Sequence, residues 1–164
     1  MANFEMTKLK NSKSIFMSLV LAFSVLLGMT INSHAVSPGW NNGKIKWMSF
    51  ARGLKEAKRT GKPMFVVFEA KWCKMCKQYR RQFYKKSVVA MSRKLTMVMV
   101  NIEKHRGLQK KYSPDGGYIP RTMAFSSNGY LNEGLTASHP EFKFFIEPKS
   151  AAELLNFMQR TAAQ

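Results

Sequence analysis

The sequence predicts an α/β fold in which a central mixed β-sheet carries helices on both faces. The continuous apolar run 64–68 has the β-branched and aromatic composition of a strand buried on both faces, and 96–102 is predicted to be a second strand. Segments with helical periodicity precede, separate and follow these runs. A third apolar stretch, 123–125, leads into Asn128-Gly129, a strong signal for a hairpin turn. This order of elements predicts a sheet with both parallel and antiparallel neighbours.

Residues 1–35 have the pattern of a secretory signal peptide. Lys8, Lys10 and Lys13 precede an apolar run at 15–31, and Ser33-His34-Ala35 offers small residues for cleavage after Ala35. The run is almost long enough to span a bilayer, so an uncleaved membrane anchor is the alternative. We expect contact with a membrane only in that case. Either form implies export to a compartment that permits disulfides.

A lead-in loop is predicted over 36–46, followed by a single domain over 47–164. The first helix starts near Trp47, with Ser49 as a plausible N-cap. Gly61 and Pro63 end it in the expected order. The strand 64–68 follows directly, so this helix should cover one face of the sheet.

The second half of the predicted domain holds shorter elements. A basic helix over 77–86, with Tyr79, Phe83 and Tyr84 on its inner side, is followed by a helical turn over 87–93. Residues 103–112 should be short and helical or irregular, and 113–117 should form a turn. A strand returning from the hairpin begins at Tyr130, and 132–149 has loop composition.

A final helix is predicted from Ala151. Ser150 and Glu153 have the spacing of a capping box, in which each side chain accepts a hydrogen bond from the other residue's backbone. Its buried stripe should consist of Leu154, Leu155 and Met158.

The chain is strongly basic, with a net charge of +18. Without residues 1–35 it keeps 24 Lys and Arg against 8 acidic residues, a charge of +16. A lysine-rich solvated surface explains this charge, and binding to nucleic acid, anionic lipid or an acidic protein is the alternative. No aromatic-interleaved basic motif or zinc-finger spacing is present, so we expect no nucleic-acid partner.

The chemistry is predicted to centre on Cys73 and Cys76, the only cysteines of the chain. A zinc site would need four ligands, and neither His105 nor His139 has finger-like spacing, so no metal is expected. A structural disulfide is a weak interpretation, because its two-residue loop constrains the unfolded chain little. At the passage from strand to helix, Cys73 would lie at a helix N-terminus, which lowers a thiol pKa. This arrangement favours redox activity.

The sequence resembles the thioredoxin superfamily in two places. Trp72-Cys73-x-x-Cys76-Lys77 follows an apolar strand, and Ile119-Pro120-Arg121-Thr122 precedes a strand and a hairpin. The resemblance implies a thioredoxin-like fold in which Pro120 is cis and lies against the cysteine pair. Trp72, Ile119 and Pro120 would then contact the substrate, with the backbone of Ile119 binding the substrate peptide as an added strand.

The stretch 113–121, Ser-Pro-Asp-Gly-Gly-Tyr-Ile-Pro-Arg, carries a closer resemblance. Together with Gly39-Trp40, Trp47 and 53–57, it is similar to the small secretory-pathway thioredoxin-domain proteins related to the anterior-gradient proteins. The similarity extends over about 39–160 and implies a single-domain thiol–disulfide oxidoreductase.

The sequence departs from these families at three points. The chain ends Arg160-Thr-Ala-Ala-Gln164 rather than in a KDEL-like signal, so the periplasm or the extracellular space is favoured and the ER lumen is possible. Val67 stands where thioredoxin has a buried acid, and Glu69 and Glu103 are the candidate substitutes. Between the cysteines stand Lys74-Met75 rather than the common Gly-Pro or Gly-His.

The function predicted from the sequence is therefore an exported thiol–disulfide oxidoreductase that acts on protein substrates. Cys73 attacks and Cys76 resolves the mixed disulfide, while Lys71, Lys74 and Lys77 stabilise the thiolate. No cofactor is expected beyond the redox-active Cys73–Cys76 disulfide. The expected partners are protein substrates with thiols or disulfides and a redox partner that restores the redox state of the cysteine pair. The protein is expected to be a monomer. The alternative is a non-catalytic module with the same fold that binds an acidic partner. Oxidase, isomerase and reductase activity all remain open.

Overall fold

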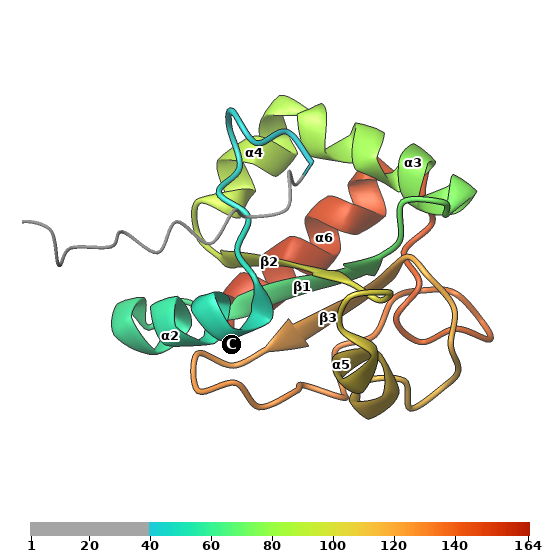
Figure 1. The fold of residues 1–164 in the computed structure, drawn as a ribbon. Coiled ribbons are helices and arrows are strands. Elements are labelled where there is room, and N and C mark those ends of the chain that lie inside the picture. The colour runs from blue at the N-terminus through green and yellow to red at the C-terminus, as the bar shows by residue number, and fades with distance from the viewer. Residues whose placement is uncertain (1–39) are drawn as a thin grey trace, which may run out of the picture. The chain divides into compact units, whose positions relative to one another are not determined.

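A computed structural model describes residues 40–164 of the chain (Figure 1). The predicted signal peptide at 1–35 and residues 36–39 of the predicted lead-in loop lie outside these residues. The described elements follow the order α2 (Phe50–Thr60), β1 (Met64–Glu69), α3 (Lys74–Arg80), η1 (Arg81–Tyr84), α4 (Lys86–Ser92), β2 (Thr96–Asn101), α5 (Arg106–Lys111), β3 (Arg121–Phe125) and α6 (Ala151–Ala162).

The described strands form one mixed sheet with β1 in its centre. The strand order is β2-β1-β3, with β2 parallel and β3 antiparallel to β1. Glu69, the last residue of β1, pairs with Asn101 of β2. Parallel neighbours need a crossover, which α3, η1 and α4 supply. The predicted fold class, thioredoxin-like with a mixed sheet between helices, is confirmed.

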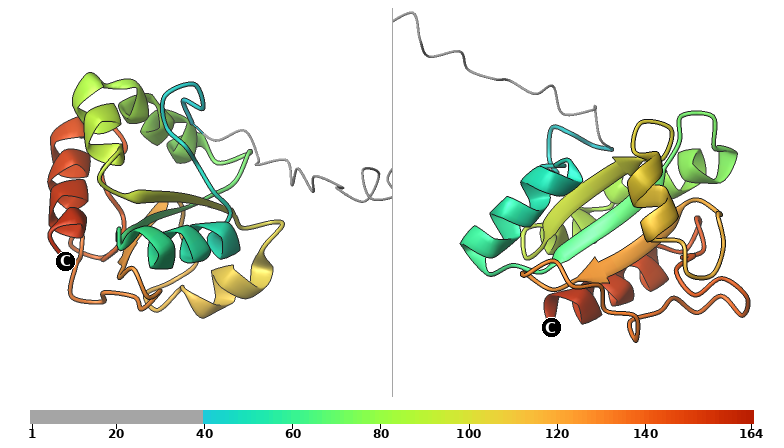
Figure 2. Two further views of the ribbon diagram at one scale, coloured as in Figure 1. Left: turned by 90° about the vertical axis from the view of Figure 1, so that its left-hand side faces the viewer. Right: turned by 60° about the horizontal axis from the view of Figure 1, so that its bottom comes forward.

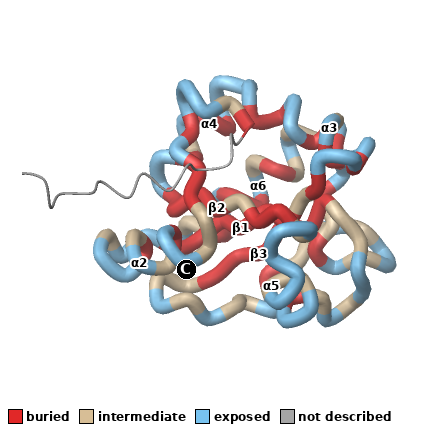
Figure 3. The backbone as a smooth tube through the Cα atoms, in the orientation of Figure 1, coloured by how far each residue is buried: buried red, intermediate tan, exposed pale blue. Residues whose placement is uncertain are grey.

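The central strand is buried on both faces, and successive side chains enter two different cores. Phe65 and Val67 pack on the side of α3, α4 and α6. Met64, Val66 and Phe68 pack on the other side, towards α2 and α5. Figures 1 and 2 show these two helical layers, and Figure 3 shows the buried sheet between them. Alternation along a strand thus builds a separate core on each face.

The first helix and the turn after it agree with the sequence prediction. Ser49 is the N-cap of α2, and Gly61 ends the helix in the left-handed conformation with a φ of 72°. The backbone N–H of Gly61 donates to the carbonyl oxygen of Ala57. A residue with a Cβ is disfavoured at this φ, which explains glycine here.

The helix after the cysteines begins earlier than predicted. It starts at Lys74 rather than Lys77, ends at Arg80 and continues as the 3₁₀ turn η1. Cys73 takes the N-cap position, a role that the usual N-cap residue types do not reveal. Tyr79 and Phe83 are buried as predicted, whereas Tyr84 is 53% exposed, because the 3₁₀ turn changes the helical periodicity.

The predicted hairpin is present only as a turn. Gly129 has a φ of 90°, and the backbone N–H of Ser126 donates to the carbonyl oxygen of Tyr130. The returning chain then makes a single bridge, between Leu131 and Phe125, instead of the predicted strand. Asn132, Glu133 and Gly134 follow Leu131, so no alternating apolar pattern continues the pairing.

The last helix starts at Ala151 as predicted, but only half of the capping box forms. The Ser150 hydroxyl accepts from the backbone N–H of Glu153 at 3.2 Å. The Glu153 carboxylate instead accepts from Ser138 and from the backbone N–H of Glu147. It therefore ties the long 132–149 loop to the helix. Leu154 and Met158 are buried as predicted, whereas Phe157 takes the place expected for Leu155, which is half-buried.

The described part of the predicted lead-in loop belongs to the core. Trp40 and Ile45 are buried with 5% and 1% exposure, as is Trp47, whose indole N–H donates to the carbonyl oxygen of Trp40. The rings of Trp40 and Trp47 pack on Phe83, on the inner side of η1. In the described range 40–164, none of the helices has the length and apolar character needed to cross a membrane.

Candidate functional site

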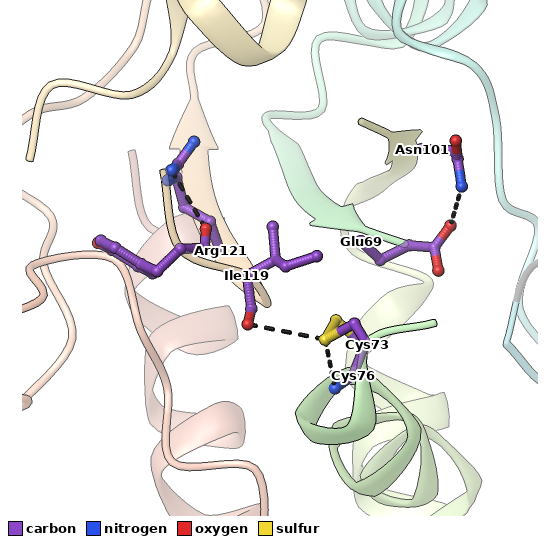
Figure 4. The surroundings of a disulfide bond; sticks show 7 residues. Glu69, Cys73, Cys76, Asn101, Ile119 and Arg121 are labelled. Carbon is purple, nitrogen blue, oxygen red and sulfur yellow. Dashed lines mark hydrogen bonds between the residues drawn. A yellow bond between two sulfur atoms is a disulfide. The ribbon is translucent and has the colours of Figure 1, made fainter. Parts of the chain in front are cut away.

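The two cysteines form a disulfide where β1 gives way to α3. As the N-cap of α3, Cys73 lies 3.0 Å from the backbone N–H of Cys76, which donates to its sulfur (Figure 4). A donor aimed at a sulfur atom stabilises negative charge on it, so it favours the thiolate once the disulfide is reduced. Cys73 and Cys76 are 4% and 2% exposed, a difference too small to assign their roles by exposure alone.

The loop before β3 brings Ile119 and Pro120 to the disulfide. The Ile119–Pro120 peptide bond is cis, as the resemblance implies. The carbonyl oxygen of Ile119 lies 3.7 Å from Cys73 Sγ, and Figure 4 shows both groups at the same edge of the site. Cys73 and Ile119 are 46 positions apart in the sequence, so the fold brings together the cysteine motif and the Ile119–Pro120 motif.

Trp72 and Met75 lie on the solvent side of the cysteine pair. Trp72 is 63% exposed and Met75 is 37% exposed, although both are large apolar side chains. Exposed side chains of this size next to a reactive group are typical of a contact surface for a partner.

Glu69, at the end of β1, is half-buried and accepts a hydrogen bond from Asn101 Nδ2 at 3.2 Å (Figure 4). Burial raises the pKa of Glu69, and the nearby charge of Glu103 adds to this increase. The hydrogen bond from Asn101 and the charges of Lys71 and Arg80 act in the opposite direction, and the net pKa is above the ordinary value.

A pocket of about 340 Å³ connects Glu69 with the inner cysteine, Cys76. Glu103 is exposed and is not among the lining residues, so the structure favours Glu69 as the acid near the disulfide. Of the predicted pKa-modulating lysines, Lys71 and Lys77 line the pocket, whereas Lys74 is exposed at the start of α3. The remaining lining residues are Trp40, Ala70, Arg80, Met99, Asn101 and Lys104.

The position of the usual buried acid is apolar here. Val67 is fully buried in the same core as both cysteines. A carboxylate at this place would have to be desolvated completely, whereas Glu69, two residues on, keeps partial access to water through the pocket. Moving the acid towards the end of the strand therefore keeps it near Cys76 at a smaller cost in desolvation.

Arg121 is a residue of the site region whose role sequence reasoning missed. It follows Pro120, opens β3 and is fully buried. Its guanidinium donates to the carbonyl oxygens of Tyr112 at 2.6 Å, Tyr118 at 3.1 Å and Gly116, and to the Ser113 hydroxyl. Burial lowers the pKa of Arg121. It thereby holds the 112–118 loop that delivers Ile119 to Cys73. The sequence signal that could have revealed this role is the charged Arg121 at the start of an otherwise apolar strand.

Among residues 40–164, no group of three or more His, Cys, Asp or Glu side chains could hold a metal ion. The described site brings together two sulfur atoms, one half-buried carboxyl group and several cationic side chains.

Comparison with protein families gives a match to the model described as thioredoxin-like, over residues 46–127, half of the chain. Among curated proteins, anterior gradient protein 3 of Xenopus tropicalis is 26% identical over 152 residues, covering 89% of this chain and 92% of that protein. The human anterior gradient protein 2 homolog is 23% identical and covers 76% of this chain and 70% of its own length.

Solved structures show the same fold at low sequence identity. A disulphide isomerase from Xylella fastidiosa Temecula1 has a TM-score of 0.54 and 18% identity, covering 80% of this chain and 97% of that one. A thioredoxin from Thermus thermophilus also has a TM-score of 0.54, with 15% identity over 71% of this chain and 86% of its own.

Proposed function

The chain belongs to the thioredoxin-like family, and from this premise we propose that it is an exported thiol–disulfide oxidoreductase acting on protein substrates. The observation that carries the proposal is the Cys73–Cys76 disulfide, set at the start of α3 and facing the cis Ile119–Pro120 peptide. In this proposal a substrate polypeptide reaches Cys73 Sγ beside the carbonyl oxygen of Ile119 and the exposed side chain of Trp72.

With the pair oxidised, a thiolate of the substrate attacks Cys73 Sγ. The Cys73–Cys76 bond breaks, Cys76 leaves as a thiolate, and a mixed disulfide joins the substrate to Cys73. A second substrate thiolate then attacks the substrate sulfur and releases Cys73 as a thiolate. Two electrons pass from the substrate dithiol to the cysteine pair, and the reverse sequence reduces a substrate disulfide. Cys73 has the outer role because the Cys76 N–H stabilises its thiolate and Ile119 lies beside it.

In this proposal Glu69 exchanges the proton of Cys76. Both line one pocket, and burial favours the protonated form of the carboxyl group, so Glu69 can deliver a proton to the leaving Cys76 thiolate. In the reverse direction it accepts the proton as Cys76 attacks the mixed disulfide. Glu103 contributes only its charge, from an exposed position.

Lys71, Lys74 and Lys77 are proposed to favour the thiolate of Cys73 by their positive charge. All three are exposed, so salt weakens their effect. Stabilising the thiolate stabilises the reduced pair, so we expect a reduction potential above the value of about −270 mV for thioredoxin. Titration against a glutathione buffer measures this potential, and a value at or below that of thioredoxin would contradict the assigned role of the lysines.

The substrate peptide is proposed to lie along Ile119 and Pro120 and to contact Trp72. An extended segment can pair with the backbone of Ile119 as an added strand, which holds its cysteine next to Cys73 without selecting a side-chain sequence. The proposal of export rests on the signal-like residues 1–35. N-terminal sequencing of the mature protein tests this part, with cleavage after Ala35 as the expected result.

Trapping of the mixed disulfide tests the cysteine roles. C76S should accumulate a covalent complex with a disulfide-containing substrate protein such as insulin, because the Cys73 thiolate opens the substrate disulfide and the resolving thiol is missing. C73S should neither form this complex nor reduce insulin. The thiol of Cys73, titrated in the C76S variant, should have a pKa below the usual value of about 8.5. Equal trapping by both variants, or an ordinary Cys73 pKa, would contradict the proposal.

A further inference from the structure

Positive charge is concentrated in the segment that contains the disulfide. Residues 71–94 hold nine Lys and Arg and no Asp or Glu. All nine side chains are exposed. They are Lys71, Lys74, Lys77, Arg80, Arg81, Lys85, Lys86, Arg93 and Lys94. Four of the eight acidic residues in the described range lie in the segment 133–153 instead. The charge is therefore segregated along the chain rather than mixed as on an ordinary solvated surface.

The cations of this segment are not neutralised by neighbours. Within residues 40–164, one salt bridge is present, between Glu56 and Arg59 of α2. Helix α2 lies on the face of the sheet opposite to α3. Glu69 is the acidic residue that lines the pocket of Cys76, and it is half-buried with Asn101 as its hydrogen-bond partner. Unpaired, exposed cations of one sign produce a local potential that attracts anionic groups.

Exposed apolar side chains lie in the same segment. The large exposed hydrophobic residues of the described range are Trp72, Met75, Tyr84 and Tyr130, and the first three belong to residues 71–94. Aromatic residues, Met and Arg are enriched in protein interfaces relative to other surface. Two independent properties, charge and apolar exposure, thus point to one binding surface around the cysteine pair.

We propose that Lys71, Lys74, Lys77, Arg80 and Arg81, here called the basic rim, select substrate polypeptides that carry acidic residues beside the reacting cysteine. The proposal rests on the exchange function proposed above and names its substrate class. Trp72 and Met75 contact the substrate backbone and apolar side chains, while the basic rim binds the flanking carboxylates. Lys71, Lys77 and Arg80 line the pocket that reaches Cys76, so the binding groups and the reacting atoms share one surface.

The geometry sets the distance between the acidic residues and the cysteine. At a helical rise of about 1.5 Å per residue, Arg80 lies roughly 10 Å along α3 from Cys73. An extended substrate covers that span in about three residues. Acidic residues within about three positions of the substrate cysteine therefore reach the rim. A polypeptide meets both requirements at once, whereas an anionic membrane or a nucleic acid would use the charge but leave the disulfide without a thiol to exchange.

The test compares three peptides of equal length with one central cysteine flanked by Glu, Gln or Lys. The rate constant for reaction with oxidised protein is measured at low salt and divided by the rate constant with a neutral small-molecule thiol. This ratio removes differences in intrinsic reactivity of the disulfide. We expect the Glu peptide to react about tenfold faster than the Lys peptide, and the preference to fall as salt screens the charges.

A charge reversal locates the effect on the rim. K77E/R81E changes two exposed residues one turn apart on the α3–η1 surface and should abolish or reverse the preference. K55E/K58E is the matched control, because it changes the net charge equally at exposed positions of α2 on the other face of the sheet. This control should keep at least about half of the preference, since distant exposed charges are screened.

Equal rates for the three peptides in wild-type protein would overturn the proposal. So would an equal loss of preference in both double variants, because net charge alone would then account for it. Tight binding to anionic lipid vesicles together with no peptide preference would assign the surface to a membrane instead. If the protein reacts with no thiol at all, the exchange function fails. Binding of a cysteine-free Glu peptide to the C73S/C76S variant, followed by fluorescence anisotropy, then tests the rim separately.

Discussion

The carboxyl group of Glu69 is placed where its charge is disfavoured. Its pKa is raised mainly by burial, so the folded state binds the proton more tightly than the unfolded chain does. The contribution of Glu69 to the free energy of unfolding is therefore fully present at pH values below its pKa in the unfolded chain. It is lost as the pH rises through its higher pKa in the folded protein. A residue that costs stability at neutral pH while lining the pocket of a reactive cysteine fits a functional role.

E69Q separates these two effects. The amide oxygen of Gln can still accept from Asn101, and the buried charge is gone, so we expect E69Q to be more stable than wild type at pH 7. The difference should vanish at low pH, where Glu69 is protonated. Disulfide exchange at pH 7 should slow, because the proton on Cys76 loses its carrier. Urea unfolding at several pH values and exchange kinetics measure the two outcomes; a variant that exchanges at the wild-type rate would remove Glu69 from the mechanism.

Arg121 acts by holding backbone rather than by touching the substrate. In R121M, the carbonyl oxygens of Tyr112, Gly116 and Tyr118 lose their donor inside the protein. We expect a loss of about 3 kcal/mol in the free energy of unfolding, the range for a broken buried polar network. R121K keeps a charge and three donors and should lose less. Denaturant unfolding of both variants checks this order, and equal stability of R121M and wild type would contradict it.

At the scale of elements, the turn at Gly129 needs a glycine. Its φ of 90° disfavours any residue with a Cβ, and a Cβ at this position would press on the Leu54 side chain of α2. G129A should therefore lower stability by about 1–2 kcal/mol.

Replacement of a second glycine, Gly107, is expected to raise stability instead of lowering it. Gly107 lies within α5, where a Cβ would have no atom within 4 Å. G107A should stabilise the protein by about 0.5–1 kcal/mol, because alanine is the better helix former. Thermal or urea unfolding of the pair tests the contrast, and a stabilising G129A would show that the turn can relax.

The strands β1 and β2 and the cysteine site could be predicted because each depends on a short contiguous run, whereas the strand predicted from Tyr130 does not form. The apolar run 64–68 and the Cys73–Cys76 spacing contain their own signal. The helix N-terminus at Cys73 was predicted from the passage from strand to helix, but the bounds read from helical periodicity, 77–86, were wrong, because the chain turns into the 3₁₀ helix η1 after Arg80. The capping box at Ser150 has the right spacing, yet Glu153 found partners in a loop folded back from 138 and 147. A local sequence pattern cannot show that groups distant in the sequence, Ser138 and Glu147, bind the Glu153 carboxylate instead of the helix N-terminus.

The site was predictable only in part for the same reason. Proximity of Ile119 to Cys73 followed from a family resemblance rather than from spacing, and contact between them was then found. The choice between Glu69 and Glu103 depends on which side chain the end of the sheet turns towards Cys76. Burial of Arg121 opposes the usual preference of charged residues for the surface, so composition could not reveal it.

At the scale of the whole molecule, the described residues 40–164 carry 24 Lys and Arg against 8 acidic residues. Like charges on a compact domain repel one another, so folding works against this repulsion. We expect moderate NaCl to raise the urea midpoint at pH 7 by screening it. K55E/K58E should show a higher midpoint than wild type at low salt and a smaller dependence on NaCl. A midpoint that falls with salt would mean that attractive ion pairs dominate.

Trp40 belongs to the folded core although it precedes residue 47, the predicted start of the domain. Its ring packs edge-on against Tyr79 and lies against Phe83, and the same residue lines the pocket of Cys76. A shortened chain that starts at residue 47, the boundary suggested by helical periodicity, would lack this wall. Water could then reach Cys76 from the interior side, and the inner sulfur would become open to attack. Trp40 therefore packs against the core and also shields Cys76 from water. Truncation at residue 47 should remove the difference in reactivity between the sulfur atoms of Cys73 and Cys76.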